Sequence, residues 1–420
     1  MTRLQLSCTQ VTETTRLGSS GDPATTQVDA PTPAIPAPSD NWPMPTDYAI
    51  IGGGIIGLTI ARELSMRGGS VTVFEKEPEL GLHASGRNSG VLHAGFYYAP
   101  DSLKAQLTAR GNRLLREFCA EQDVPVRSCG KVVVATSEDQ LPALDELARR
   151  GQANGVRLEV IDEKHLADLE PLAQTHERAI WSPDTAVADP TAVTAALRRD
   201  LLARGVQIRT STPVTSPPDA GHVVNAAGLY ADRVAQWYGF CDDYVMMPFK
   251  GLYWYGDARA PHLQRHVYPV PDPRNPFLGV HFTVTAAGGV KVGPTAIPVL
   301  SREAYTFTLR RDEAREVVTS FPAFLRGGHH DVPALLRSEL PKYSRRWLQH
   351  QARALIPSAT GFTIKGAPGI RAQLMHKATG ELEMDFLVRG DERSTHVLNA
   401  VSPAWTGSFA FAQYVVDRMG

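Results

Sequence analysis

The sequence predicts an α/β protein, α+β over the whole chain, and three observations lead to that prediction. A short apolar strand, a glycine-rich turn and a helix follow one another within residues 47–76. Helical apolar spacing then alternates with short strand-like runs as far as residue 228. Between residues 246 and 295, aromatic and β-branched runs separated by Pro and Gly are typical of an antiparallel sheet.

Residues 47–76 read DYAIIGGGIIGLTIARELSMRGGSVTVFEK, which places G-x-G-x-x-G between a strand and a helix. Gly52 permits the turn, Gly54 lets a pyrophosphate approach the helix N-terminus, and Gly57 allows the helix to pack closely on the strand. A second strand ends at Glu75, whose carboxylate can accept hydrogen bonds from an adenosine ribose. The unit therefore predicts a Rossmann-like dinucleotide site.

Composition excludes several classes of protein. The 420 residues carry a formal net charge of −1, so no basic field favours nucleic acid as a partner. The four cysteines lack C-x-x-C spacing, which predicts neither a disulfide framework nor a metal site. No apolar run approaches the roughly 20 residues that span a bilayer. We expect a cytoplasmic protein that is at most peripheral to a membrane.

Two segments have unusual composition. Residues 1–45 are rich in Thr, Pro, Ser and Ala and predict a disordered leader. An organelle-targeting role is the alternative, although four acidic residues count against it: Glu13, Asp22, Asp29 and Asp40. Residues 301–355 have helical patterning with many arginines, which predicts a solvated face or, as the alternative, a peripheral contact with an anionic membrane.

Residues 81–100 are rich in Gly and polar side chains, and they predict a loop followed by a short strand. Ser89 and the amide of Gly90 belong to a stretch that could bind phosphate or the edge of a ring system. His93 and Tyr98 could face a substrate. The alternative is a capped surface loop.

Two further turns of small residues could face a cofactor. The apolar strand of residues 223–226 ends at Ala227 and Gly228, where a cofactor could lie against the backbone or the chain could simply turn. Residues 402–408, with Ser402, Ala404 and Gly407, precede a helix expected from about Phe409. Amides and the dipole at that helix N-terminus could face an electron-rich group.

Several longer blocks carry a resemblance to a known family: IIGGGIIGL, FEKE, GRNSGVLHAGFYYAPDSLKA, VVNAAGLYADRVA, MPFKG, VYPVPDPRNPFLGVHFT, GPTAI and GIRAQ. Together they resemble the FAD-dependent oxidoreductases of the D-amino-acid oxidase superfamily, most closely its L-2-hydroxyglutarate oxidase/dehydrogenase branch. The resemblance implies a discontinuous FAD-binding domain of residues 46–100, 185–245 and 356–420. Residues 101–184 and 246–355 would form a substrate domain whose antiparallel sheet covers the isoalloxazine.

The chain departs from the family's pattern at two places. Residues 211–222 are too short for the β-meander that similar proteins insert there, although Val214 remains a candidate contact on the adenine side. Trp405 stands in VSPAWTGS where similar proteins have smaller residues, and it could narrow the pocket. The exact substrate is therefore open.

The resemblance implies oxidation of a 2-hydroxy acid, foremost L-2-hydroxyglutarate to 2-oxoglutarate, by hydride transfer from C2 to flavin N5. A histidine suits removal of the hydroxyl proton. We predict His281, since the LGVHFT strand is expected to face the flavin. If strand alternation turns His281 into the core, His93 takes the role.

Cations are needed for the carboxylates of such a substrate. Arg371 could clamp one carboxylate through two hydrogen bonds, and Lys250 could add a second charge for a dicarboxylate. Tyr98 and Tyr268 could donate hydrogen bonds to the same groups. For each residue the alternative is an ordinary surface or core side chain.

Three points stay open at the level of sequence. The protein could instead be an amine or amino-acid oxidase of the same superfamily, or a flavin-binding protein without catalysis. The electron acceptor could be a quinone, another carrier or oxygen. His83 is a remote candidate for a covalent flavin link. FAD is favoured over NAD as the resident cofactor because the chain has a single nucleotide fingerprint.

Overall fold

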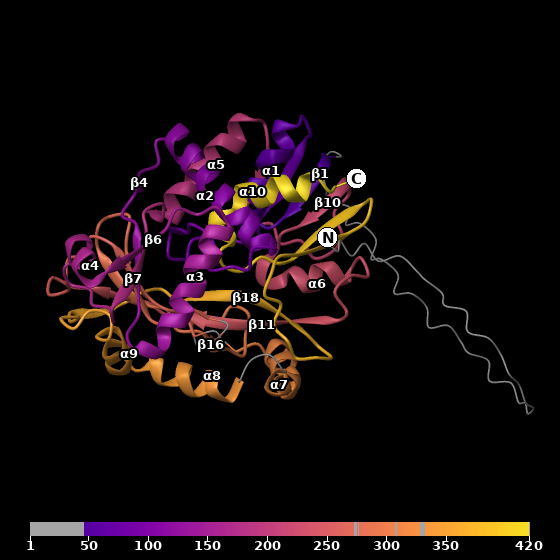
Figure 1. The fold of residues 1–420 in the computed structure, drawn as a ribbon. Coiled ribbons are helices and arrows are strands. Elements are labelled where there is room, and N and C mark those ends of the chain that lie inside the picture. Colours follow the sequence, from indigo (N-terminus) through magenta and orange to yellow (C-terminus); the bar gives the residue numbers. More distant parts are fainter. Residues whose placement is uncertain (1–45, 273–274, 276, 307–308, 328–331, 420) are drawn as a thin grey trace, which may run out of the picture.

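The computed structural model describes residues 46–272, 275, 277–306, 309–327 and 332–419 (Figure 1). The leader predicted for residues 1–45 lies outside this range. Among the described residues, no helix combines the length and apolar character needed to cross a membrane.

A six-stranded sheet in the order β19-β20-β10-β1-β2-β9 forms the first layer. All neighbours pair in parallel except β19 and β20. A parallel sheet needs crossover connections, and the first one is the predicted helix α1 between β1 and β2. The strands are β1 (Thr46–Ile51), β2 (Val71–Phe74), β9 (Gln207–Arg209), β10 (Ala220–Asn225), β19 (Leu387–Gly390) and β20 (Ser394–Asn399).

Helices cover both faces of this sheet. Alternation along β1 sends Ile50 to the core shared with α1, α5 and α10, while Ala49 and Ile51 face the core that includes Val234 of α6. Figure 1 shows α1, α2, α5 and α10 grouped together, with α6 on the other side of the sheet. Their bounds are α1 (Ile55–Met66), α2 (Leu103–Glu121), α5 (Pro190–Ala203), η2 (Gly228–Tyr230), α6 (Ala231–Gln236) and α10 (Ala404–Val416).

The second layer is an eight-stranded sheet in the order β17-β12-β15-β14-β13-β5-β7-β6. It confirms the predicted antiparallel sheet, with one parallel pair, β5 with β13. Its strands are β5 (Lys131–Val134), β6 (Glu159–Asp162), β7 (Arg178–Ser182), β12 (Trp254–Gly256), β13 (His266–Pro269), β14 (His281–Val284), β15 (Val290–Gly293) and β17 (Phe362–Lys365). The helical pieces η1 (Glu138–Gln140), α3 (Leu141–Ala153) and α4 (Glu163–Leu169) belong to the same region.

Two small sheets connect these layers. In the order β16-β11-β18, the strands β11 (Tyr244–Gly251) and β18 (Gly369–His376) pair along their full length, with β16 (Ile297–Pro298) at the edge. Helices α7 (Arg311–Arg326), α8 (Val332–Glu339) and α9 (Arg345–Ala352), with η3 (Leu340–Tyr343), lie along the lower edge of Figure 1. The other sheet joins β3 (Val91–Leu92), β8 (Ala186–Ala188) and β4 (Val126–Arg127).

Two details differ from the expected boundaries. Helix α10 begins at Ala404 rather than near Phe409, because Trp405 buries its ring in the core with Phe409 and extends the helix backwards. Strand β17 joins the eight-stranded sheet, so the segment assigned to FAD binding from residue 356 begins beside the substrate layer. The division of the chain into two domains stays a prediction.

Candidate active site

A cavity of about 750 Å³ opens at the carboxyl ends of β1, β2 and β10. This is where ligands bind in open α/β sheets. Its described lining runs from the glycine-rich turn through residues 81–93 and 212–215 to β18 and the start of α10. The cavity thus joins segments that lie more than 300 residues apart in sequence.

The glycine-rich turn has the conformation and the close approaches for which its sequence needs glycine. Gly52 has φ +113°, and a Cβ there would lie 2.4 Å from the carbonyl oxygen of Ala226. Gly54 occupies the N-cap of α1 and lines the cavity. At Gly57 a Cβ would lie 2.0 Å from the carbonyl oxygen of Gly52, so only glycine lets α1 sit this close to the turn.

Glu75 lies at the end of β2, where it is buried and faces the cavity. Its Oε2 accepts a hydrogen bond from the Gly53 amide at 2.7 Å, and Oε1 accepts one from the Glu77 amide at 2.9 Å. The carboxylate is therefore fixed beside the glycine-rich turn. This is the position from which an acid can reach a ribose hydroxyl.

Most other predicted cofactor residues also line the cavity: Ser89, Val214, Ala227, Gly228, Ser402 and Ala404. Gly90 and Gly407 are not among its described lining residues. Gly90 has φ +74° and packs against the carbonyl oxygen of Ala188, which explains it as a turn residue. Gly407 lies inside α10, and its Cα would lie 2.6 Å from a Cβ on Gly111 of α2. The crossing of these two helices therefore requires glycine at position 111.

His93 is a buried residue on the cavity wall. Its backbone amide donates to Thr406 Oγ1 at 3.1 Å, which ties it to the first turn of α10. Nδ1 has no hydrogen-bond partner among the described residues. Burial, reinforced by the charge of Lys131, holds the pKa of His93 well below its usual range. The imidazole is therefore neutral near pH 7 and can accept a proton.

Arg371 projects from β18 to the cavity. Its guanidinium lies 5.0 Å from the centre of the Phe277 ring. Within the described part of the chain, no hydrogen bond or ion pair to the Arg371 guanidinium is found, and Glu339 acts on it only electrostatically. Burial lowers its pKa, but an arginine stays charged. A guanidinium on a cavity wall is suited to binding an anion.

His281 and Tyr268 lie one layer behind the wall. The two rings are stacked at 3.8 Å, and neither residue is among the described lining of the cavity. His281 Nδ1 donates to the Gly279 carbonyl at 2.8 Å, which leaves Nε2 as an acceptor. Burial lowers the pKa of His281 to about 3. The alternation considered above has turned His281 inward, so the geometry favours His93 as the residue that meets a substrate.

Lys250 and Tyr98 are not brought to Arg371 at the cavity wall. In the β11–β18 pairing, Phe249 stands opposite Arg371 and Lys250 stands opposite Ile370, so Lys250 and Arg371 point to opposite faces. The Lys250 ammonium donates to the Ala304 carbonyl at 2.5 Å. Tyr98 lies outside the described lining and near the buried ammonium of Lys104, 5.9 Å from its ring centre.

Sequence reasoning missed two residues of this region. Tyr253 lines the cavity in front of His281, with ring centres 6.4 Å apart. Burial raises the pKa of Tyr253 to about 12, so it remains a hydrogen-bond donor. Lys131 is buried behind the wall among aromatic rings. The only signal in the sequence was a lysine opening an otherwise apolar strand.

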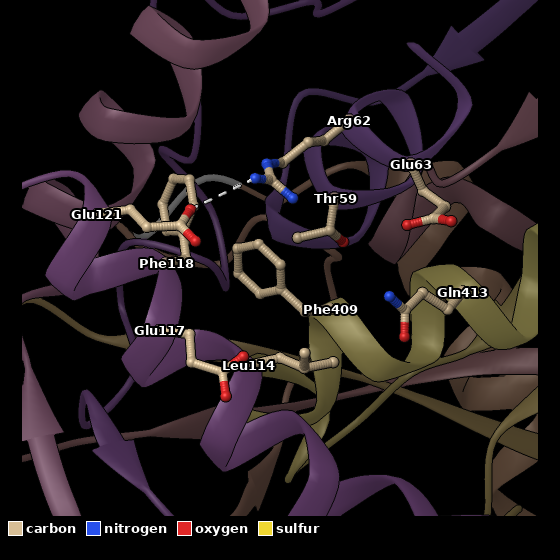
Figure 2. Close-up of a pocket in the computed structure, with 9 residues that line it drawn as sticks. All are labelled: Thr59, Arg62, Glu63, Leu114, Glu117, Phe118, Glu121, Phe409 and Gln413. Atoms are coloured by element: carbon tan, nitrogen blue, oxygen red, sulfur yellow. Dashed lines mark ion pairs between the residues drawn. The ribbon is translucent and has the colours of Figure 1, made fainter. Parts of the chain in front are cut away.

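A second hollow, between α1, α2 and α10, is much smaller, at about 80 Å³ (Figure 2). Phe118 and Phe409 form part of its wall, and Arg62 is paired with Glu121 at 3.8 Å and with Asp200 at 2.8 Å. Its size and its paired charges leave no room for a dinucleotide. Of these two cavities, only the larger fits one.

Comparison with known proteins shows to which family the chain belongs. Residues 47–418 match the family described as DAO, FAD dependent oxidoreductase. The chain belongs to this family of FAD-dependent oxidoreductases. The confirmed fold and the cavity at the carboxyl end of the sheet agree with that assignment.

Individual relatives narrow the comparison. The chain is 36% identical to the mitochondrial L-2-hydroxyglutarate dehydrogenase of Nematostella vectensis, over 91% of both chains. It is 34% identical to the L-2-hydroxyglutarate dehydrogenase of Indibacter alkaliphilus, over 88% of this chain and 97% of the relative. The FAD-bound L-α-glycerophosphate oxidase of Mycoplasma pneumoniae shares the fold, with a TM-score of 0.73 and 24% identity over 90% of this chain and 95% of that one.

The residues present fit FAD. The cavity has the size of a cofactor site, and its lining includes the fixed carboxylate of Glu75, the N-terminus of α10 with Trp405, and Arg371. Gly52, Gly54, Glu75, Ala227 and Gly228 would hold the nucleotide half. Ser402 and Ala404 would face the flavin half.

Proposed function

We propose that this protein oxidises L-2-hydroxyglutarate to 2-oxoglutarate, using FAD as its resident cofactor. The observation that carries the proposal is the placement of Arg371, whose guanidinium has no hydrogen-bond or ion-pair partner in the described part of the chain, on the same cavity wall as a neutral histidine, His93. The relatives named L-2-hydroxyglutarate dehydrogenase, at 32–36% identity, support the choice of substrate. When bound, FAD accepts a hydride equivalent from the substrate.

Separate side chains bind the substrate and accept its proton. Arg371 binds the carboxylate next to the reacting carbon through charge-assisted hydrogen bonds. His93 accepts the hydroxyl proton on Nε2, because Nδ1 is enclosed and only the other ring nitrogen is left for the cavity. Tyr253 stays protonated and can donate a hydrogen bond to the substrate. His281, behind Tyr253, is the second candidate for the proton.

The test is anaerobic bleaching of the bound flavin with a panel of compounds. L-2-hydroxyglutarate should bleach it, while D-2-hydroxyglutarate, L-lactate, L-glutamate, glycine and glycerol 3-phosphate should act at least tenfold more slowly. Bleaching by an amino acid but not by any hydroxy acid would establish the amine-oxidase alternative. A flavin that no compound reduces would establish binding without catalysis.

The proposed electron acceptor is a membrane quinone, reached by peripheral contact from the cytoplasm. The α7–α9 surface, defined as the exposed side of α7, η3 and α9, combines apolar and basic side chains: Val318, Leu325, Leu340, Tyr343 and Trp347 with Arg311, Arg315, Arg326, Arg345 and Arg346. Such a mixture binds anionic lipid. Another carrier or oxygen remains the alternative acceptor.

Vesicle flotation tests this contact. The protein should float with vesicles that contain phosphatidylglycerol, and the Leu325→Asp/Trp347→Ser variant should remain in the soluble fraction. A variant at an exposed apolar residue elsewhere, Val160→Asp, is the matched control and should float like the wild type. Equal flotation of all three proteins would show that the α7–α9 surface does not bind the membrane.

A further inference from the structure

Lys131, the first residue of β5, is fully buried. Its ammonium has no hydrogen-bond or ion-pair partner among the residues that the structure describes. Three aromatic rings surround it instead, with their centres 4.7 Å away for Phe96, 4.5 Å for Tyr97 and 4.7 Å for Tyr268. Burying an ammonium without an anion is costly, and ring faces offset only part of the cost.

The strand register connects this lysine to His281. Strand β5 pairs with β13, so that Lys131 stands beside His266 and Val133 beside Tyr268. Strand β13 pairs in turn with β14, and the Tyr268 ring stacks on His281 with 18° between the ring planes. Lys131 and His281 therefore contact the same tyrosine ring on one face of the sheet.

The charges around the two site histidines are positive. His281 is influenced by Lys131 from β5, Arg371 from β18 and His266 from β13, with Tyr253 and Tyr268 as its neutral neighbours. His93 is influenced by Lys131, His266 and His281. No carboxylate contributes to either pKa. Besides His266, whose pKa burial lowers to about 3, Lys131 is the group that acts on both histidines.

We propose that Lys131 is a positioning residue of the active site: its caged ammonium holds the Tyr268–His281 stack in place and adds a positive charge near the site histidines. A neutral imidazole is then ready to accept the hydroxyl proton of the substrate, while the hydride equivalent goes to FAD. The acceptance of the substrate's proton rests on the proposed function, whereas the effect of Lys131 on the histidines is independent of it.

The effect has a defined pH range. Burial lowers the pKa of Lys131 to about 7. The lysine is therefore charged below pH 7, where its charge adds to burial in opposing protonation of the histidines, and it becomes neutral above pH 7. Removing the charge should therefore change the rate of flavin reduction only at acidic pH.

The first experiment follows the rate of anaerobic flavin reduction by L-2-hydroxyglutarate against pH. In Lys131→Met the acid limb should move to higher pH by roughly one unit, the size of effect expected from one nearby charge, and the rates should meet those of the wild type above pH 8. Lys131→Arg keeps a charge and should retain the acid limb of the wild type. Val133→Ala removes packing from the same face of β5 and should lower stability without moving the limb.

The second experiment needs no substrate. Histidine NMR titration of the FAD-loaded wild type should show the signals of His93 and His281 remaining neutral down to pH 5, and both midpoints should rise in Lys131→Met. Titration of either histidine above pH 6 in the wild type would overturn the proposal, even if the methionine variant did not fold. An acid limb that Lys131→Met leaves in place, or that Val133→Ala moves equally, would also overturn it. If no hydroxy acid reduces the flavin, the proposed function fails while the titration still decides the role of Lys131.

Discussion

The close approach of α1 to the glycine-rich turn gives the sharpest prediction, for Gly57→Ala. A Cβ at Gly57 would lie 2.0 Å from the carbonyl oxygen of Gly52 and 3.2 Å from Cγ2 of Ile50. The first distance must open by about 1 Å to reach 3.0 Å, below which Cβ contacts essentially never occur. The obstacle is backbone, so α1 has to move away from the turn that faces the cavity.

Overpacking of this kind costs about 1–3 kcal/mol. If the displacement falls on the cofactor site, the dissociation constant of FAD should rise by roughly 5- to 150-fold. Flavin fluorescence titration of the apoprotein measures this constant, and urea unfolding measures the accompanying loss of stability. Gly407→Ala is the matched control, since its Cβ would meet only Leu107 and Phe386 at 3.7 and 3.9 Å. It should bind FAD normally and gain up to about 1 kcal/mol from helix propensity. A Gly57→Ala protein with the FAD affinity and stability of the wild type would refute the reasoning.

Three further predictions concern charge. Arg371→Met should raise KM for L-2-hydroxyglutarate by about 10- to 100-fold with FAD content unchanged, because hydrogen bonds to charged groups contribute roughly 1.5–3 kcal/mol; an unchanged KM would exclude Arg371 from carboxylate binding. Glu75→Gln presents an amide donor where two backbone amides need an acceptor, so the dissociation constant of FAD should rise about tenfold in fluorescence titrations. Burial lowers the pKa of His266 to about 3 from 6.5, so the unfolded chain binds more protons between these values and stability falls as pH drops through that window. Urea unfolding should show roughly 2 kcal/mol less stability at pH 5 than at pH 7 from this residue, and His266→Phe should reduce the difference.

The βαβ unit could be predicted from sequence because its requirements are local. Gly52, Gly57 and Glu75 act within one strand-turn-helix-strand segment, and steric limits on that segment are readable from residue types alone. The small-residue turn of α10 was placed correctly at the cavity but begins its helix at Ala404. Packing of Trp405 into the core decided that boundary.

Which polar residues reach the cavity, and which lie behind its wall, could not be predicted in the same way. Whether Lys250 joins Arg371 depends on the register of β11 with β18, strands about 120 residues apart in sequence. His281 and His93 both lie in motif blocks, and only the stacking of Tyr268 places His281 behind the wall. Lys131 acquires its neighbours through the parallel pairing of β5 with β13. Each of these facts is a property of tertiary pairing.

The same pairing links substrate binding to proton acceptance. Burial above all, with Lys131 as a further cause, lowers the pKa of His93 and of His281, and Arg371 adds to this at His281. A carboxylate bound at Arg371 would cancel part of this positive field and so raise the pKa of the nearest histidine. The imidazole would thus become a stronger base only when the anionic substrate is in place. A neutral alcohol of the same size would leave the field unchanged, and for that reason the proposed site would favour hydroxy acids at the proton-transfer step as well as at binding.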